Sequence, residues 1–273
     1  MTEELRARQI NWDALWEEDR KRSLHRNDRA HWDKRAPSFA KHVSEGSYTK
    51  QFLKLLLPEP HWSVLDVGCG AGTLAIPLAK QTKCVTAIDF SPVMIELLRA
   101  GCRENAIDNV KAVLGSWEDD WSALGIAVHD VAIASRSFAI ENPRAAIGKL
   151  NSFARKRAYI SAPVADGPFD RRLFRALGRE WKPRPDYIYT YNILYQMNIF
   201  ANVAFITSSR NKTYESRESA YESVRWMFQN ISEDEDRKLR AFLSEHLVPH
   251  GSGVRLDYDR SVRWAVMWWD IPQ

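Results

Sequence analysis

Residues 63–79 read SVLDVGCGAGTLAIPLA, and this stretch decides the fold. Residues 63–67 form a short run rich in β-branched and aliphatic side chains, which predicts a buried strand. Gly68, Gly70 and Gly72 follow it, and apolar residues then continue as the start of a buried helix. Glycine lets the backbone lie close against a ligand, and the N–H groups at a helix start point into the same space. Strand, glycine turn and helix together predict a nucleotide-binding site.

A second strand, at 84–88, ends in Asp89. This acid lies about twenty residues past the glycines, where it can accept hydrogen bonds from both hydroxyls of a ribose. The two features at this spacing are far more specific than either one alone. The alternative is an ordinary tight turn after the first strand, with Asp89 merely capping the next helix.

The glycine spacing bears on which nucleotide is bound. A dinucleotide site needs G-x-G-x-x-G, because the pyrophosphate must approach the helix closely. Here the third glycine comes one residue early and Thr73 takes its place, which disfavours a nicotinamide dehydrogenase. Asp66, near the end of the first strand, is also badly placed beside a pyrophosphate. A cationic ligand suits it better, and S-adenosylmethionine carries both a sulfonium and an ammonium group.

With these residues in place, the chain resembles the class I S-adenosylmethionine-dependent methyltransferases that act on small molecules. The resemblance lies in LDVGCGAGTLAIPLA at 65–79 and in AIDFSPVMIELL at 87–98, which is similar to the second segment of that family. It implies that S-adenosylmethionine is the cofactor and that Asp89 binds its ribose. The remaining implied contacts are Asp66, Gly68, Cys69, Gly70 and Gly72 for the methionine half, and Phe90 and Met94 near the adenine.

A third strand at 110–114 leads into Gly115, Ser116 and Trp117. The family commonly shows Gly-Asp here and uses the acid to bind the adenine amino group. In this chain Ser116 stands at that position, so either its hydroxyl or Glu118 would accept the hydrogen bond. Trp117 either stacks on the adenine or packs on its own domain.

The fourth strand, at 131–134, ends in Ser135-Arg136-Ser137-Phe138. Ligands of open parallel sheets lie at the carboxyl ends of the strands, so this tetrapeptide should face the methyl group, with Ser135 at the cofactor. It differs from the Asn-Pro-Pro-Tyr and Asp-Pro-Pro-Tyr of enzymes that methylate base amines or glutamine side chains. Arg136 either binds a substrate carboxylate or phosphate as a fork or forms a structural ion pair.

The other segments complete the predicted fold. Amphipathic patterns predict N-terminal helices over 3–22, from 28 to a break near Pro37, and over 48–57. The stretch WDKRAPSFAKH at 32–42 resembles the segment that precedes the core of many small-molecule methyltransferases, where N-terminal helices cover the cofactor. Further predicted elements are a helix at 143–153, strands at 157–161 and 202–206, helices at 215–230 and 233–247, and a closing antiparallel strand at 254–271.

These elements predict one Rossmann-like α/β domain. Its sheet has seven strands, mostly parallel, with helices on both faces. We divide the chain into an N-terminal helical cap (1–46), a cofactor-binding core (47–208), a helical lid insertion (209–250) and the closing strand of the core sheet (251–273).

The expected reaction is in-line methyl transfer to a small molecule, which needs mainly positioning and the exclusion of water. A base is required only if the acceptor is protonated. Tyr187, Tyr191 and Tyr195 share one side of a helix, where they either line the acceptor pocket or pack on the sheet. The candidate catalytic residues are Tyr191, His42 and Arg136, with His31 and Glu141 as further possible bases.

Composition excludes several classes of protein. The chain of 273 residues is 45% hydrophobic and 27% charged, as in ordinary globular proteins. Its N-terminus is charged from residue 3, so we expect no signal peptide, no membrane segment and a cytoplasmic location. The three cysteines lack ligand spacing, so we expect neither a metal site nor disulfides.

Charge bears on the partner. The net charge of +4 is too balanced to indicate a nucleic-acid binder, although residues 20–41 are locally basic and form either a solvated helix face or an anion site. A methyltransferase of tRNA or another nucleic acid is therefore the alternative function. A module that binds S-adenosylmethionine without catalysis is another. The sequence does not indicate an oligomeric state.

Overall fold

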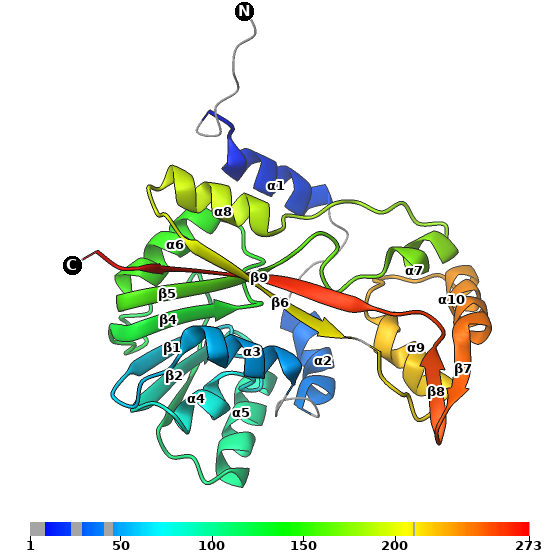
Figure 1. Ribbon diagram of the computed structural model, residues 1–273, viewed down its shortest axis with the longest axis horizontal. Coiled ribbons are helices and arrows are strands. Elements are labelled where there is room, and N and C mark those ends of the chain that lie inside the picture. The colour runs from blue at the N-terminus through cyan, green and yellow to red at the C-terminus, as the bar shows by residue number, and fades with distance from the viewer. Residues whose placement is uncertain (1–8, 23–28, 41–45, 210, 273) are drawn as a thin grey trace, which may run out of the picture.

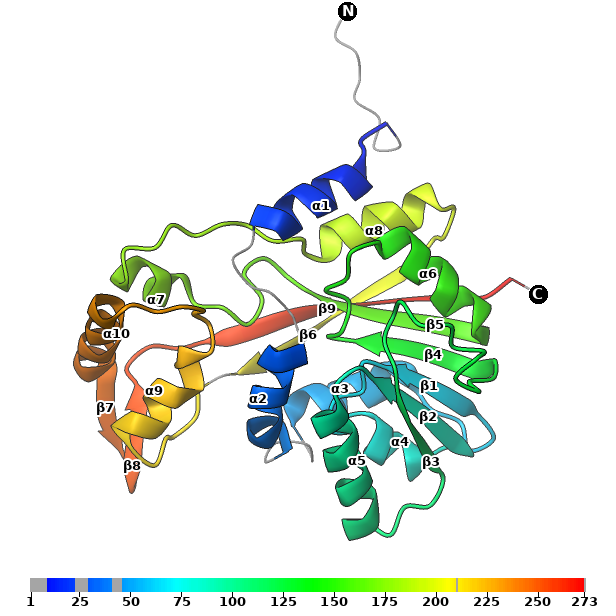
Figure 2. The ribbon, with the colours of Figure 1, turned by 180° about the vertical axis from the view of Figure 1, so that it is seen from behind.

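A computed structural model describes residues 9–22, 29–40, 46–209 and 211–272. Within these residues, seven strands form one sheet in the order β3-β2-β1-β4-β5-β9-β6 (Figures 1 and 2). The pairs among the first five strands are parallel, and β9 is antiparallel to both of its neighbours, which confirms the predicted sheet. The strands are β1 Ser63–Val67, β2 Cys84–Asp89, β3 Val110–Leu114, β4 His129–Ser135, β5 Ala154–Pro163, β6 Asn202–Ser209 and β9 Ser261–Asp270.

Helices cover both faces of this sheet because alternate strand residues are buried on opposite sides. Val64 and Val85 face a core shared with α3, α4 and α5, whereas Leu65 and Ala132 face a core shared with α6, α8 and α1. No helix in the described ranges is both long and apolar enough to span a bilayer. The helices are α1 Trp12–Arg22, α3 Ser47–Leu56, α4 Ala75–Ala79, α5 Pro92–Glu104, α6 Pro143–Ser152 and α8 Tyr187–Gln196.

The order of strands creates a switch point between β1 and β4. From β1 the chain winds outward through β2 to β3, and it then returns to pair β4 on the other side of β1. Ligands of such sheets bind outside the carboxyl ends of the strands at this point. The glycine turn follows β1 and the Ser135-Arg136 segment follows β4, so both lie at the switch point.

A smaller unit with its own apolar core lies to one side of the sheet (Figures 1 and 2). Buried Leu173 and Phe174 of α7 pack there with Leu239 and Leu243 of α10. We call this unit the insertion. Its elements are α7 Arg171–Ala176, α9 Arg217–Arg225, α10 Glu233–His246, and a hairpin of β7 Leu247–His250 and β8 Gly253–Leu256.

Two sequence predictions about these elements were wrong. The single strand at 254–271 is two strands, because β8 pairs with β7 in the insertion and the chain then turns at the polar residues 257–260 before entering β9. The helix expected to break near Pro37 instead runs through it, as α2 Arg29–Ala40. Proline in a helix interior costs roughly 3 kcal/mol. Packing of α2 on α5, with Ala36 fully buried, offsets that cost.

Asp170 ties the insertion to the sheet. Its carboxylate is 4% exposed, accepts a hydrogen bond from the Arg172 amide at 3.0 Å as the N-cap of α7, and pairs with Arg260 Nε at 3.2 Å. The hydroxyl of Tyr258 donates to the same carboxylate at 3.3 Å. Since Arg260 directly precedes β9, these contacts join the segment after β5 to the start of the last strand.

We expect Asp170→Ala to lower the free energy of unfolding by about 3–5 kcal/mol, because removing one partner of a buried ion pair leaves the other uncompensated. Chemical denaturation measures the change as a shift of the midpoint. Glu218→Ala is the matched control, since it breaks an exposed pair with Arg240 and should barely move the midpoint. Equal midpoints for the two variants would show that Asp170 does not hold the insertion in place.

Candidate functional site

The three glycines after β1 all adopt left-handed backbone conformations, with φ of +68° at Gly68, +54° at Gly70 and +94° at Gly72. Two of them permit close packing within the protein. A Cβ at Gly68 would lie 2.3 Å from Cβ of Ser137, and one at Gly72 would lie 2.6 Å from a methyl of Leu98. At Gly70 the nearest neighbour is the Met94 sulfur, 3.9 Å away. The turn is therefore open to a ligand at Gly70.

Asp89 braces this turn from the end of β2. One carboxylate oxygen accepts a hydrogen bond from the Gly70 amide at 2.9 Å, and the other accepts one from the Ser91 amide at 2.9 Å. Burial raises the pKa of Asp89, and these two amides oppose the shift. The N-cap of α5 is Ser91, whose hydroxyl accepts from the Met94 amide at 3.1 Å. Each Asp89 oxygen keeps a further lone pair with which to accept from a ligand hydroxyl.

Asp66 is the more unusual acid. It is 2% exposed, and its Oδ2 has no hydrogen-bond partner among the described residues. Burial raises its pKa to about 7, the negative charge of Asp89 adds to the rise, and Arg136 opposes it. A buried carboxylate without a partner is costly, and a cation placed against it relieves that cost. The site therefore fits the ammonium group of an S-adenosylmethionine ligand.

The remaining predicted cofactor residues line the same edge of the sheet. Met94 is buried against Ala71, and Phe90 is half-buried at the end of β2. Cys69 is buried in the turn, and burial raises the pKa of its thiol. After β3, the Ser116 hydroxyl accepts from the Glu118 amide at 3.2 Å, and the Trp117 ring packs edge-on against Phe138. These last two residues make local contacts at the carboxyl end of β3.

Tyr48, at the start of α3, joins the ends of β4 and β5. Its hydroxyl shares hydrogen bonds with Ser135 Oγ at 2.8 Å and with Ser161 Oγ at 2.7 Å. The Arg136 guanidinium lies over its ring, 4.2 Å from the centroid. Burial raises the pKa of Tyr48, so the phenol stays protonated at neutral pH. Sequence reasoning missed this residue because its partners lie 87 and 113 positions away in the chain.

Helix α2 covers the cofactor side of the site. Asp33 accepts a hydrogen bond from the Ser91 hydroxyl, and Ala36 is buried against Ala71 of the glycine turn. The Arg35 guanidinium lies 4.0 Å from the centroid of the Trp226 ring, which belongs to the insertion. One helix thus contacts both the glycine turn and the insertion. The resemblance of 32–42 to a cofactor-covering segment was the available sequence signal for Asp33.

The catalytic candidates fare differently. His42 lies outside the described residues. Tyr191 is 36% exposed on a face of α8 whose other tyrosines pack on exposed aromatic rings, Tyr187 on Phe205 and Tyr195 on Phe200. The structure therefore does not bring Tyr191 to the glycine turn, because helical spacing shows which residues share a side but not what that side faces.

Two other candidates, Glu141 and Arg136, differ in where they lie. Glu141 is 77% exposed and pairs with Arg20 at 3.1 Å. Arg136 does lie at the carboxyl end of β4, close enough to Asp66 to lower the pKa of that acid.

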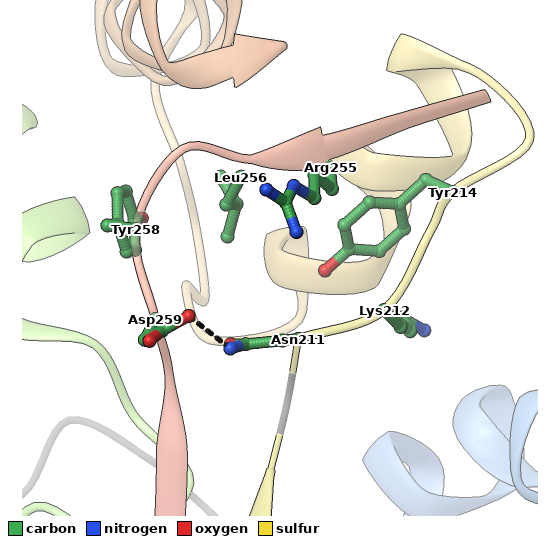
Figure 3. Close-up of a pocket in the computed structure, with 7 residues that line it drawn as sticks. All are labelled: Asn211, Lys212, Tyr214, Arg255, Leu256, Tyr258 and Asp259. Atoms are coloured by element: carbon green, nitrogen blue, oxygen red, sulfur yellow. Dashed lines mark hydrogen bonds between the residues drawn. The ribbon is translucent and has the colours of Figure 1, made fainter. Parts of the chain in front are cut away.

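A small pocket lies where the insertion joins the segments after β6 and before β9 (Figure 3). Its free space is about 20 Å³, room for about one water molecule. Of its lining residues, Asn211 donates a hydrogen bond to Asp259 (Figure 3). A pocket of this size cannot hold a nucleoside. The lining residues are Asn211, Lys212, Tyr214, Arg255, Leu256, Tyr258 and Asp259.

Comparison with known proteins agrees with this geometry. Residues 58–219 match the family model of the methyltransferase domain. An uncharacterized protein of Haemophilus influenzae is 33% identical over 248 residues, which is 88% of each chain. A 23S rRNA (uracil(1939)-C(5))-methyltransferase of Pseudomonas entomophila is 37% identical over 62 residues, 23% of this chain and 14% of that protein. A candidate methyltransferase from Bacillus halodurans C-125 has a similar fold, with a TM-score of 0.56 at 14% identity over 84% of this chain and 100% of that one.

The pKa of Asp66 leads to a pH-dependent affinity. An ammonium ligand binds the ionised carboxylate, so the Kd of S-adenosylhomocysteine should fall about tenfold per pH unit up to about pH 7 and level off above it. Titration calorimetry between pH 5.5 and 8 measures this. Asp66→Asn should bind weakly, with no such pH dependence. A wild-type affinity that does not change with pH would contradict the role of Asp66.

The same variant provides a folding control. A carboxyl whose folded pKa is raised from 3.8 to about 7 destabilises the free protein increasingly as pH rises through that window. Asp66→Asn removes this effect, so the free variant should melt later than wild type at pH 8. Its weak ligand binding then cannot be attributed to unfolding.

Asp89→Ala should weaken binding of S-adenosylhomocysteine by about 1–3 kcal/mol, or roughly 5- to 150-fold, because the ribose hydroxyls lose their acceptor. Calorimetry at pH 7.5 gives the Kd. Asp108→Ala, an exposed acid beyond the end of α5, is the matched control and should bind like wild type. Unchanged affinity in Asp89→Ala would remove the ribose assignment.

Proposed function

The chain belongs to the methyltransferase-domain family and is a class I S-adenosylmethionine-dependent methyltransferase, and from this premise we propose that its acceptor is a small molecule. The observation that carries the proposal is the contact between Arg35 of α2 and Trp226 of the insertion, at 4.0 Å. Helix α2 packs on the glycine turn after β1, and Trp226 packs on Phe169, which follows β5. The contact therefore spans the carboxyl ends of the central strands. A site covered by this contact between α2 and the insertion suits a small acceptor better than a polymer.

The chain's own contribution is to bind, orient and exclude water. When bound, S-adenosylmethionine supplies an electrophilic methyl group on its sulfonium. Asp66 would hold the ammonium group, Asp89 the ribose hydroxyls, and the open backbone at Gly70 would lie against the ligand. Holding donor and acceptor in line accounts for much of the rate in such a transfer. The cap and the insertion would keep water from the reacting centre.

The end of β4 would orient the acceptor. Tyr48 is hydrogen-bonded to two serines and stays protonated, which suits a positioning residue and not a base. Ser135 shares its hydroxyl with Tyr48, and Arg136 lies over the same ring. These residues favour an acceptor atom that is nucleophilic without loss of a proton to the enzyme.

The charges of α1 also support a small acceptor. Arg20 pairs with Glu141 at 3.1 Å, while Lys21 and Arg22 pair with Glu17 and Glu18 one helical turn earlier. A nucleic-acid surface needs several basic side chains free to contact phosphates. In α1, the basic side chains of Arg20, Lys21 and Arg22 are already paired with acids.

An RNA acceptor is the second candidate, favoured by the short similarity to a 23S rRNA methyltransferase. That similarity covers 14% of the rRNA enzyme, so it does not carry that enzyme's acceptor over to this chain. The two functions differ in their response to salt. Nucleic-acid affinity falls roughly 10³- to 10⁵-fold between 50 and 200 mM salt when six to ten phosphates are contacted.

A labelling experiment separates the two acceptors. Purified protein is incubated with methyl-labelled S-adenosylmethionine and with either the small-metabolite fraction or the total RNA of a bacterial extract. We expect label in the metabolite fraction, changing less than about threefold over that salt range because one small ligand releases few counterions. Asp66→Asn should abolish it. Label in RNA that declines steeply with salt would overturn the proposal.

A further inference from the structure

We infer that the methyl acceptor carries a carboxylate or phosphate group and that Arg136 and Arg184 bind it. This inference rests on the proposed small-molecule function and assigns the chemical class of that molecule. It depends on two half-buried guanidinium groups, one directly after β4 and one packed on the segment between β5 and the insertion, each without an acid partner among the described residues.

Arg136 is held in place by its backbone. Its φ is +57°, a conformation that strains a residue other than glycine and that occurs more often at functional sites than elsewhere. Its amide donates to Ser161 Oγ at 2.9 Å. Its guanidinium lies over the Tyr48 ring and makes neither an ion pair nor a hydrogen bond within the described parts of the chain.

Arg184 lies in the segment between α7 and α8. Its guanidinium packs on the Phe169 ring, 3.8 Å from the centroid, and its Nε is buried without a hydrogen-bond partner. Burial lowers the pKa of Arg184 to about 10, and no acid in the described parts of the chain opposes that shift. Asp186, two residues later, instead accepts from the amides of Ala165 and Ile188. Arg184 thus has a fixed position and no counter-charge among the described residues.

Other arginines of the same region do have acid partners. Arg260 pairs with Asp170 at 3.2 Å, and Arg171 pairs with Asp166 at 2.5 Å. A guanidinium removed from water without an anion is costly, and its planar fork matches a carboxylate or phosphate. An anionic ligand would supply the negatively charged partner that Arg136 and Arg184 lack among the described residues.

Arg136 follows β4 directly, whereas Arg184 reaches the segment after β5 through its contact with Phe169. Strands β4 and β5 are adjacent parallel strands whose carboxyl ends meet at one edge. Phe169 also contacts Trp226, with ring centroids 5.4 Å apart. Aromatic surface therefore lies beside the two cations. This combination fits an acceptor with an apolar or aromatic body and an anionic group.

Simple probes test this class directly. Benzoate and phenyl phosphate each carry a ring and one anionic group, and benzamide is the neutral control. Protein saturated with S-adenosylhomocysteine is titrated with each probe and followed by ligand-observed NMR. We expect binding of at least one anion, no binding of benzamide, and a loss of at least tenfold in affinity in Arg136→Gln and in Arg184→Gln. Whichever anion binds more tightly identifies carboxylate or phosphate as the preferred group.

The cofactor's own carboxylate is the other anion that can approach this edge, and a second measurement separates the two. The Kd of S-adenosylhomocysteine should change less than twofold in both variants when it is measured well above the pKa of Asp66, where loss of Arg136 no longer changes the ionisation of that acid. A tenfold loss in Arg136→Gln, with probe binding unaffected, would assign Arg136 to the cofactor tail and overturn the inference. Arg155→Gln, exposed near the opposite end of β5, is the matched control and should leave every affinity unchanged.

Failure of this inference differs from failure of the small-molecule proposal. If both variants bind the anions as wild type does, the arginines have no ligand role, while label can still appear in the metabolite fraction. If label appears in RNA, the proposed function fails whatever the probes do. The two experiments therefore report on separate claims.

Discussion

The carboxylate of Asp89 joins the glycine turn to the start of α5, and the site depends on that bridge. It accepts from the Gly70 amide and from the Ser91 amide, so it holds the ends of β1 and β2 in one geometry. The turn can stay open at Gly70 because its other two glycines are packed against Ser137 and Leu98. A rigid frame with one bare backbone position is a preorganised site, which loses little entropy when a ligand binds.

Asp66, which lies near Asp89, is a buried acid without an ion-pair partner among the described residues. Asp66 is buried with one oxygen unpartnered, and Arg136 lies near it without forming an ion pair. Full pairing of Asp66 with Arg136 would stabilise the free protein, but it would also occupy the position that a cationic ligand needs. The arrangement exchanges stability for binding, a common feature of functional sites.

Two segments far apart in the sequence enclose the edge of the sheet. Helix α2 comes before the core and the insertion comes late in it, yet Arg35 and Trp226 are in contact. Asp170 and Arg260 anchor the insertion at the entry to β9. Helix α2 therefore joins the glycine turn to the insertion, which is itself anchored where β9 begins.

The sequence by itself determined the strand, the glycine turn and the acid at the end of β2, because these follow from glycine conformation, apolar patterning and spacing over about thirty residues. It also indicated seven strands, although it merged β8 with β9, since both read as one alternating run. Only the tertiary structure decided that Tyr48 bonds to Ser135 and Ser161, that Tyr191 is 36% exposed, and that Arg184 packs on Phe169 with no acid partner among the described residues. Those relations depend on which distant segments meet across the sheet, and local pattern carries no record of that choice.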